Sequence, residues 1–250
     1  LAFIDQVLHK QEETVAAIDY LLKHGMVAKG GADLLHGRFN YLKELGESGD
    51  TLYHDLLDRV FHSSGGRLHI ENITGISGEI ALRAGTSDTP FGVINVGDDA
   101  KLVKLCEKHD LFTQDSRFSE SLFHGINTDG SPVNLLLGSK KFTEGWSSWR
   151  VSNMTLMNVG KNEGAQIIQL FGRGVRLKGW KTTLKRSAEL ATGLKEAGLE
   201  RPDHIGVMET LNIFGVKADY IAQFRKELED EEIPVNEGLE EFVLPLKPMK

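Results

Sequence analysis

Two amides and two arginines between residues 166 and 176 fall on one side of a helix. With about 100° between successive residues, four side chains project from an arc of about 80°: Gln166, Gln169, Arg173 and Arg176. The apolar side chains of the same stretch project from the opposite side: Ile167, Ile168, Phe171 and Val175. Two guanidinium groups on one face suit phosphate oxygens, because they stay charged and offer a planar fork of donors. The alternative is an amphipathic surface helix whose two arginines are simply solvated, since such a helix has the same pattern.

A second group of polar residues directly follows an apolar run at residues 135–137. The run predicts a buried strand, and ligands of open α/β sheets gather beyond the carboxyl ends of strands. Ser139, Lys140 and Lys141 could contact phosphates, and Gly145 would let the backbone approach a ligand closely. The alternative is a plain surface loop after a core strand.

Charge is distributed unevenly along the chain. The 250 residues carry a net charge of −7, which argues weakly against a dedicated nucleic-acid domain. Residues 137–186, however, hold ten Lys or Arg against two Glu, so this window is +8 and the remainder is −15. The window also contains all three tryptophans: Trp146, Trp149 and Trp180. Cations mixed with flat rings suit polyphosphates and nucleic-acid strands, although a solvated basic face is equally compatible.

Together these segments resemble motifs V and VI of superfamily 2 helicases. The motif VI pattern Gln-x-x-Gly-Arg-x-x-Arg is matched by Gln169, Gly172, Arg173 and Arg176. The loop with Glu144, Gly145 and Trp146 precedes it by about twenty residues, as in the family. The Thr-Glu-Gly-Trp wording is most similar to the ATP-dependent subunit of type III restriction enzymes and related prokaryotic DEAD/DEAH-type proteins. The resemblance covers residues 67–180 and extends more weakly to about residue 228.

The resemblance implies a catalytic role for three residues of the second motif. Arg173 and Arg176 would reach the γ-phosphate of an ATP held by the first RecA-like domain, and Gln169 would position them or the nucleotide. Such arginine fingers contribute on the order of 10³ to 10⁵ in rate.

Two further groups of residues receive binding roles from the same resemblance. The implied nucleotide-binding residues are Glu144, Gly145, Ser147 and Gly172. The implied nucleic-acid-binding residues are Ser139, Lys140, Lys141 and Trp146. Many relatives have aspartate where Ser147 stands, which leaves the metal or ribose contacts of this loop open.

The sequence lacks a convincing phosphate-binding loop of the form Gly-x-x-x-x-Gly-Lys-Ser/Thr. Residues 174–182 come near it, but Trp180 is inserted before Lys181. The pair Asp98 and Asp99 imitates a magnesium-binding motif, although helix capping explains it better. ATP with Mg²⁺ is therefore expected to be bound mainly by a first RecA-like domain that the sequence lacks, and the isolated chain is expected to hydrolyse no ATP. No metal site is expected, because His54, His62, His69 and His124 have no ligand-like spacing.

The expected function is thus half of an ATP-dependent DNA helicase or translocase. Its expected partners are DNA, the first RecA-like domain of the same polypeptide and, as a candidate, a modification or nuclease subunit or domain. The alternative is a non-catalytic nucleic-acid- or phosphate-binding module that retains the RecA-like fold.

The elements that must position these residues follow from periodicity. Residues 1–64 predict a helical accessory subdomain, with stripes such as Ile4, Leu8 and Val15. Strand and helix alternate over residues 65–200, which predicts a RecA-like, mainly parallel sheet flanked by helices. Its expected strands are at 67–73, 79–83, 91–96, 121–126, 133–137 and 154–159, and Asp98 is expected to cap a helix. Residues 201–250 predict a helical extension and linker.

Composition excludes a membrane protein. No stretch approaches 18 uninterrupted apolar residues, and the first residues have neither a basic leader nor a cleavage-like site. A soluble, cytoplasmic protein without a membrane partner is expected. The single cysteine, Cys106, is expected to be a buried and inert thiol. The absence of an initial methionine suggests a segment of a longer protein.

Overall fold

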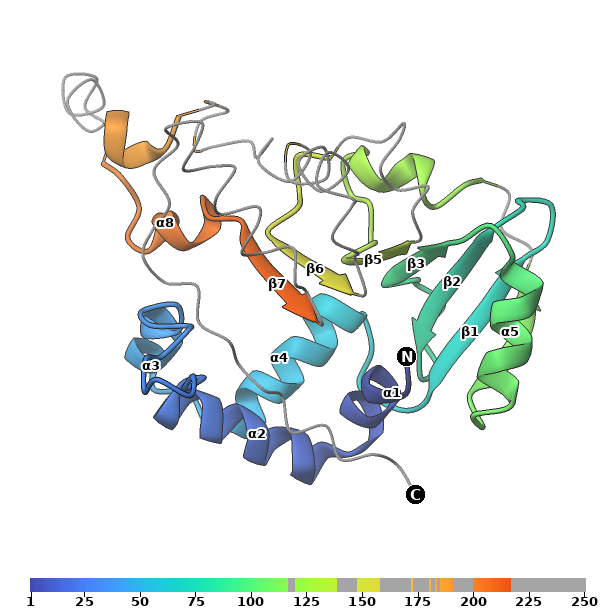
Figure 1. The fold of residues 1–250 in the computed structure, drawn as a ribbon, viewed down its shortest axis with the longest axis horizontal. Coiled ribbons are helices and arrows are strands. Elements are labelled where there is room, and N and C mark those ends of the chain that lie inside the picture. Colours follow the sequence, from blue (N-terminus) through green and yellow to red (C-terminus); the bar gives the residue numbers. More distant parts are fainter. Residues whose placement is uncertain are drawn as a thin grey trace. The chain divides into compact units, whose positions relative to one another are not determined.

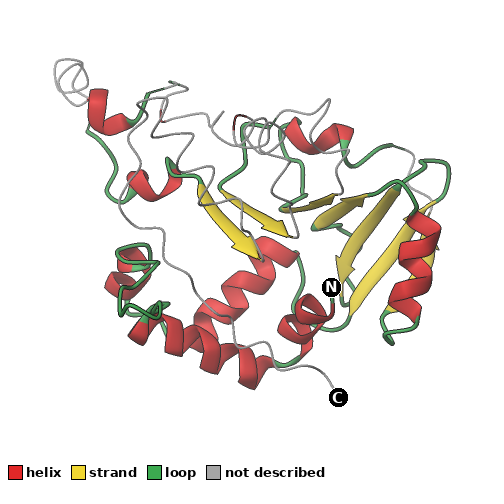
Figure 2. Cartoon of the chain, in the orientation of Figure 1, coloured by secondary structure: helices red, strands yellow, loops and turns green. Residues whose placement is uncertain are grey.

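The computed structural model describes residues 1–116, 120–138, 148–157, 172, 180, 183, 185–190 and 200–216 of the chain. These residues belong to two compact units (Figures 1 and 2). The first unit holds the described residues up to 138, and the second holds those from 148 onward.

The first unit begins with four helices, where the periodicity predicted a helical region with three apolar stripes. They are α1 (Ala2–His9), α2 (Gln11–His24), α3 (Asn40–Leu45) and α4 (Gly49–Phe61). The apolar stripe from Ile4 to Leu22 is divided between α1 and α2, because Lys10 leaves the helical region of backbone space at φ −105° and ψ 71°. Ser48 starts α4 by accepting a hydrogen bond from the Thr51 amide at 3.1 Å.

A five-stranded sheet follows the helices. Its strands are β1 (Leu68–Ile73), β2 (Glu79–Ala84), β3 (Gly92–Asn95), β4 (Phe112–Ser116) and β5 (Leu135–Gly138). They lie in the order β4-β1-β2-β3-β5. Strand β2 is antiparallel to β1 and β3, whereas β4 and β5 pair in parallel with β1 and β3. Four strands therefore point in one direction, and the unit is mixed α/β with a mostly parallel sheet flanked by helices.

The two long connections of the sheet lie on opposite faces. Helix α5 (Asp99–Glu107) joins β3 to β4 and places Cys106 in the core beside the β2 residues Ile80 and Leu82. Residues 120–134 join β4 to β5, and there Ser121 donates to the carboxylate of Glu79. Because side chains alternate along β2, Glu79 points away from the face of Ile80. Both faces of the sheet are covered in this way.

The helices and the sheet share one hydrophobic core. Leu8, Tyr53 and Leu57 from the helices pack with the β1 residues Leu68 and Ile70. Burial raises the pKa of Tyr53, whose hydroxyl donates to the carbonyl oxygens of Val7 at 3.0 Å and Leu8 at 3.3 Å. The change from helix to strand near residue 65 is thus a change of element within a continuous core.

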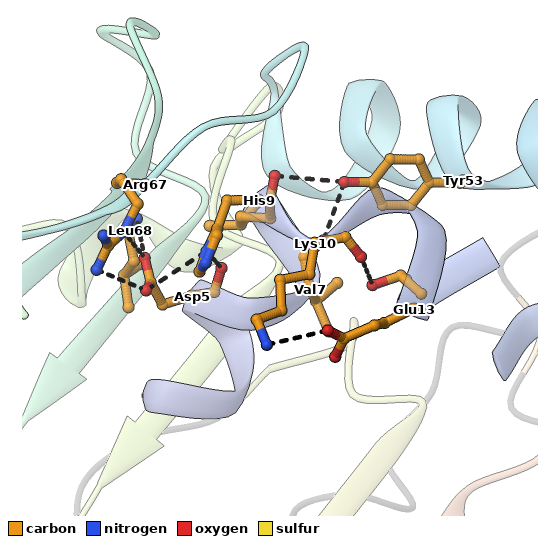
Figure 3. Close-up of polar contacts among 10 residues, drawn as sticks. Asp5, Val7, His9, Lys10, Glu13, Tyr53, Arg67 and Leu68 are labelled. Atoms are coloured by element: carbon orange, nitrogen blue, oxygen red, sulfur yellow. Dashed lines mark hydrogen bonds and ion pairs between the residues drawn. The ribbon is translucent and has the colours of Figure 1, made fainter. Parts of the chain in front are cut away.

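A buried carboxylate fastens α1 to the first strand (Figure 3). Asp5 is only 5% exposed, and it accepts hydrogen bonds from Arg67 Nε at 3.0 Å and from the Leu68 amide at 2.8 Å. Arg67 Nη2 lies 2.9 Å from the same carboxylate. A buried charge that is paired and hydrogen-bonded avoids the large cost of desolvation. The first helix therefore has a fixed position on the sheet.

Two predicted elements differ from the structure. Residues 121–126 were expected as a strand, but Ser121 and the Phe123 amide bind Glu79, and a 3₁₀ turn, η1, follows at His124–Asn127. Residues 212–228 were expected to be helical, but Asn212–Val216 forms strand β7, because its Ile, Phe and Val side chains favour a sheet with a partner strand. The remainder of that stretch lies outside the described residues. Strand β4 was not expected at all.

The described part of the second unit is a two-stranded parallel sheet with short helices. Strand β6 (Asn153–Met157) pairs with β7, from Asn153 opposite Asn212 to Met157 opposite Val216. The short helices are η4 (Ser187–Leu190) and α8 (Ile205–Met208). Ser187 is fully buried, where its hydroxyl donates to Glu209 at 2.8 Å and accepts from Arg201 Nε at 2.7 Å.

No helix within the described ranges is long and apolar enough to cross a bilayer.

Candidate nucleotide and nucleic-acid site

The predicted binding loop begins at the carboxyl end of β5. Strand β5 runs parallel to β3, with Gly138 opposite Asn95. The carboxyl ends of β1, β3, β4 and β5 all reach the same edge of the sheet, because these four strands point in one direction. Strand β5 therefore ends, at Gly138, at the kind of edge where open α/β sheets bind ligands.

Most of the predicted site residues lie outside the described part of the chain. This holds for the loop residues Ser139, Lys140, Lys141, Glu144, Gly145, Trp146 and Ser147, and for Gln169, Arg173 and Arg176. Gly172 is described: it has helical backbone, it is exposed, and an added Cβ would meet no atom within 4 Å. The proximity of the arginines to the loop after β5 stays a prediction.

The start of β5 is fixed by the end of α4. Asn134 immediately precedes the strand, and its side-chain amide donates to the carbonyl oxygens of Arg59 at 3.1 Å and Val60 at 3.0 Å. These are carbonyl groups of the last helical turn, which have no partner within the helix. His62, at φ 52°, contacts the Pro132 carbonyl oxygen through Nε2 at 2.8 Å. The strand that leads into the predicted loop is thus held at its base.

The acidic pair after β3 caps a helix, as predicted. The Asp98 carboxylate accepts a hydrogen bond from the Lys101 amide at 2.9 Å, which is the N-cap interaction of α5. Asp99 accepts from the Ala100 amide at 3.0 Å, and its other oxygen lies 3.4 Å from the Gly78 amide. Both carboxylates therefore have roles in the fold itself.

A buried ion pair lies on the sheet face opposite to the main apolar core. Glu71 is fully buried and accepts hydrogen bonds from Arg83, through Nε at 2.6 Å and also through Nη2, and from Gln114. The hydrogen bond to Glu71 raises the pKa of Arg83, and Asp88 adds to this effect. Sequence reasoning missed this network, although alternating charges at Glu71 and Arg83 within two apolar strands are a detectable signal.

The contacts of His54, His69 and Cys106 belong to the fold. The His69 ring contacts the Phe112 ring at an interplanar angle of 53°, with centroids 4.6 Å apart, and His54 lies 3.8 Å from the carboxylate of Asp50 in the same helix. Within the described ranges, no group of three or more His, Cys, Asp or Glu side chains is arranged to hold a metal ion. Cys106 is 3% exposed, and burial raises the pKa of its thiol, so the predicted buried thiol is confirmed.

Comparison with known proteins gives no match. No protein-family model fits the chain, and neither a curated protein nor a solved structure is detectably similar to it.

Proposed function

We propose that this chain is the second RecA-like part of a superfamily 2 helicase-type motor, related to the ATP-dependent subunit of type III restriction enzymes. The observation that carries the proposal is the spacing of Gln169, Gly172, Arg173 and Arg176 after a Glu-Gly-Trp loop. The described fold supports it in a coarser way. A mostly parallel sheet flanked by helices is compatible with a RecA-like domain, and β5, the strand before the predicted loop, ends at the carboxyl edge of that sheet.

The proposed chemistry is electrostatic. ATP with Mg²⁺ is held mainly by a first RecA-like domain, and Arg173 and Arg176 act on it from this chain. Their charge stabilises the transferring phosphoryl oxygens, on which negative charge is spread in the transition state. Gln169 keeps the arginines or the nucleotide in position, while Glu144, Gly145, Ser147 and Gly172 line the nucleotide side of the cleft. These roles come from the motif match.

The proposed nucleic-acid partner is DNA. Ser139, Lys140 and Lys141 follow β5 directly, and Trp146 lies in the same loop. A hydroxyl and two ammonium groups would bind backbone phosphates, and the indole would stack on a base. The excess of ten cations over two carboxylates in residues 137–186 favours the same partner.

The alternative is a binding module without catalysis, and the missing phosphate-binding loop favours it. Steady-state ATP hydrolysis by the full-length gene product, measured with and without DNA, separates the two functions. A motor hydrolyses ATP and is stimulated by DNA. DNA binding without any hydrolysis would leave the binding module as the function and remove the motor.

A further inference from the structure

Helix α5 carries three lysines on one exposed side. With about 100° between successive residues, Lys101, Lys104 and Lys108 project from an arc of about 60°. Lys108 is the C-cap, but its backbone is still right-handed helical at φ −64° and ψ −17°, so the helical geometry extends to it. All three side chains are exposed. The helix itself therefore brings the three cations to one surface, which we call the lysine face.

The opposite side of α5 holds the helix on the sheet. Leu102, Val103 and Cys106 project from about 100° to 200° on the same scale, with Lys101 at zero. Cys106 is buried in the core, and Leu102 and Val103 pack against it. Figure 1 shows α5 beside β1, with which it is in contact. The lysine face therefore points away from the sheet.

The charges of the lysine face are not neutralised by ion pairs. In α4, Arg59 pairs with Asp55 of the same helix at 3.3 Å. Glu107 follows Lys104 by three residues and could form a similar pair, but it accepts a hydrogen bond from the Thr113 hydroxyl of β4 at 3.0 Å instead. Among the described residues, no carboxylate lies at ion-pair distance from any of the three lysines. Uncompensated cations on one surface attract an anionic partner.

The lysine face begins near the carboxyl edge of the five-stranded sheet. Strand β3 ends at Asn95, which lies opposite Gly138, the last residue of β5. Asp98, three residues after β3, starts α5 and accepts a hydrogen bond from the Lys101 amide at 2.9 Å. The lysine face therefore starts at the edge where β5, the strand before the predicted DNA-binding loop, also ends.

The length of the lysine face matches a row of phosphates. At about 1.5 Å per residue, the helix rises about 10.5 Å from Lys101 to Lys108. One strand of duplex DNA carries a phosphate for about every 3.4 Å of its axis, so the lysine face spans about three of them.

The lysine face lacks the apolar anchors of a protein interface. Leu105 lies next to the lysines on the helix surface and is 51% exposed. Single exposed apolar side chains are common on protein surfaces, whereas protein partners are usually bound through clustered aromatic or aliphatic anchors. Repeated positive charge with one leucine therefore favours a polyanion over a protein.

We propose that the lysine face of α5 binds the phosphate backbone of DNA. It is a contact surface in addition to the predicted residues after β5, and it binds without regard to base sequence, because ammonium groups contact only phosphates there. The inference rests on DNA as the partner in the proposed function. It does not depend on the arginine fingers.

The test is binding of a fluorescein-labelled DNA duplex to the 250-residue chain, followed by anisotropy over a salt series. A double variant, Lys104→Ala with Lys108→Ala, should bind several-fold more weakly. Its plot of log affinity against log salt should be shallower by about 1.8, at about 0.9 for each duplex phosphate that the protein no longer neutralises. Lys104→Arg with Lys108→Arg keeps both charges and should bind like the wild type.

A matched control removes the same charge from elsewhere in the first unit. Lys23 and Lys43 are exposed, and each is the only Lys or Arg of its helix, α2 and α3 respectively. Lys23→Ala with Lys43→Ala should therefore keep the affinity and the salt dependence of the wild type.

Cross-linking provides an independent readout. Leu105→Cys can be labelled with a benzophenone maleimide, because the native Cys106 is 3% exposed and does not compete for the label. Light should then cross-link position 105 to the duplex, whereas a Tyr20→Cys label on the exposed surface of α2 should give no cross-link. Preferential cross-linking of position 105 to polyglutamate over the duplex would assign the lysine face to an acidic protein and overturn the proposal.

The binding outcomes separate this inference from the proposed function. If the wild type binds DNA and the Lys104/Lys108 variant behaves like the Lys23/Lys43 control, the lysine face is removed and DNA remains the partner. If the wild type binds no duplex, the lysine face and the DNA partner are both removed, and the ATP hydrolysis test still decides whether the protein is a motor.

Discussion

Strands β3 and β5 are parallel neighbours that end at the same edge of the sheet, but the residues that follow them in the sequence carry opposite charges. After β3 come Asp98 and Asp99, and both carboxylates accept hydrogen bonds from backbone amides of the helix start. After β5 come Lys140 and Lys141, followed by a glycine-containing stretch that has no capping pattern. Position at the carboxyl edge is therefore not sufficient to identify a ligand site. Charged side chains that already hydrogen-bond to the backbone of the fold, such as Asp98 and Asp99, must first be removed from the list of candidate ligand-binding residues.

The largest expected effect belongs to the arginines that the proposal pairs with the loop after β5. In the full-length gene product with DNA present, Arg176→Ala should lower ATP turnover by on the order of 10³ or more, because the missing charge acts on the transition state. Arg173→Ala should behave similarly. Lys185→Ala, in the same basic window but beyond the motif, should leave turnover nearly intact, which controls for bulk charge.

The next effect tests whether the carboxylates of the first unit serve the fold. Glu71→Ala should destabilise the chain by about 3 kcal/mol, because it leaves the largely buried guanidinium of Arg83 without its main partner. Asp55→Ala removes an exposed ion pair with Arg59 and should cost less than about 0.5 kcal/mol. Urea unfolding followed by circular dichroism measures both. Equal stabilities of the two variants would mean that burial of the Glu71 pair has no energetic weight.

A smaller effect is expected for the lysines after β5. Lys140→Ala with Lys141→Ala should weaken binding of duplex DNA about tenfold and make its salt dependence shallower by about 1.8, at about 0.9 for each duplex phosphate that the protein no longer neutralises. Fluorescence anisotropy over a salt series measures both quantities. Unchanged affinity and unchanged salt dependence would show that this basic loop has been misassigned.

The smallest effect concerns the turn after β3. Asp98→Ala should cost about 1 kcal/mol of stability, since it removes the N-cap of α5. Asp98→Asn retains an acceptor and should recover most of that loss. Neither variant should alter ATP turnover or DNA affinity in the full-length gene product. A large loss of Mg²⁺-dependent turnover with normal stability would instead assign Asp98 to a metal.

Local patterns predicted the first unit well because their causes are local. The stripe of Ile4, Leu8 and Val15 predicted helix where α1 and α2 lie, and Asp98 predicted the start of α5, as the structure confirms. Gly75 and Gly78, both with positive φ, lie in the turn between the strands predicted at 67–73 and 79–83, which form β1 and β2.

Long-range pairing is where the sequence was insufficient. Strand β4 is composed of Phe112, Thr113, Gln114, Asp115 and Ser116, so it has little apolar alternation and depends on parallel pairing with β1. Strand β7 likewise depends on β6, about 60 residues earlier in the chain. The short connection from β1 to β2 implies that these two strands are antiparallel. It does not reveal that β2 is the central strand of the five. At the site, the Asn134 contacts with α4 join residues more than 70 positions apart, which no local motif reveals.

The most direct test of the proposed function compares the affinity of the full-length gene product for two nucleotide states. MgADP with aluminium fluoride mimics the transferring phosphoryl group, whereas MgADP alone does not. If Arg176 stabilises the transition state, Arg176→Ala should weaken binding of the aluminium fluoride complex by orders of magnitude and leave MgADP affinity nearly unchanged. Arg176→Lys should recover little, because an ammonium group lacks the planar fork. Equal affinities of the wild type and Arg176→Ala for the aluminium fluoride complex would contradict the assignment.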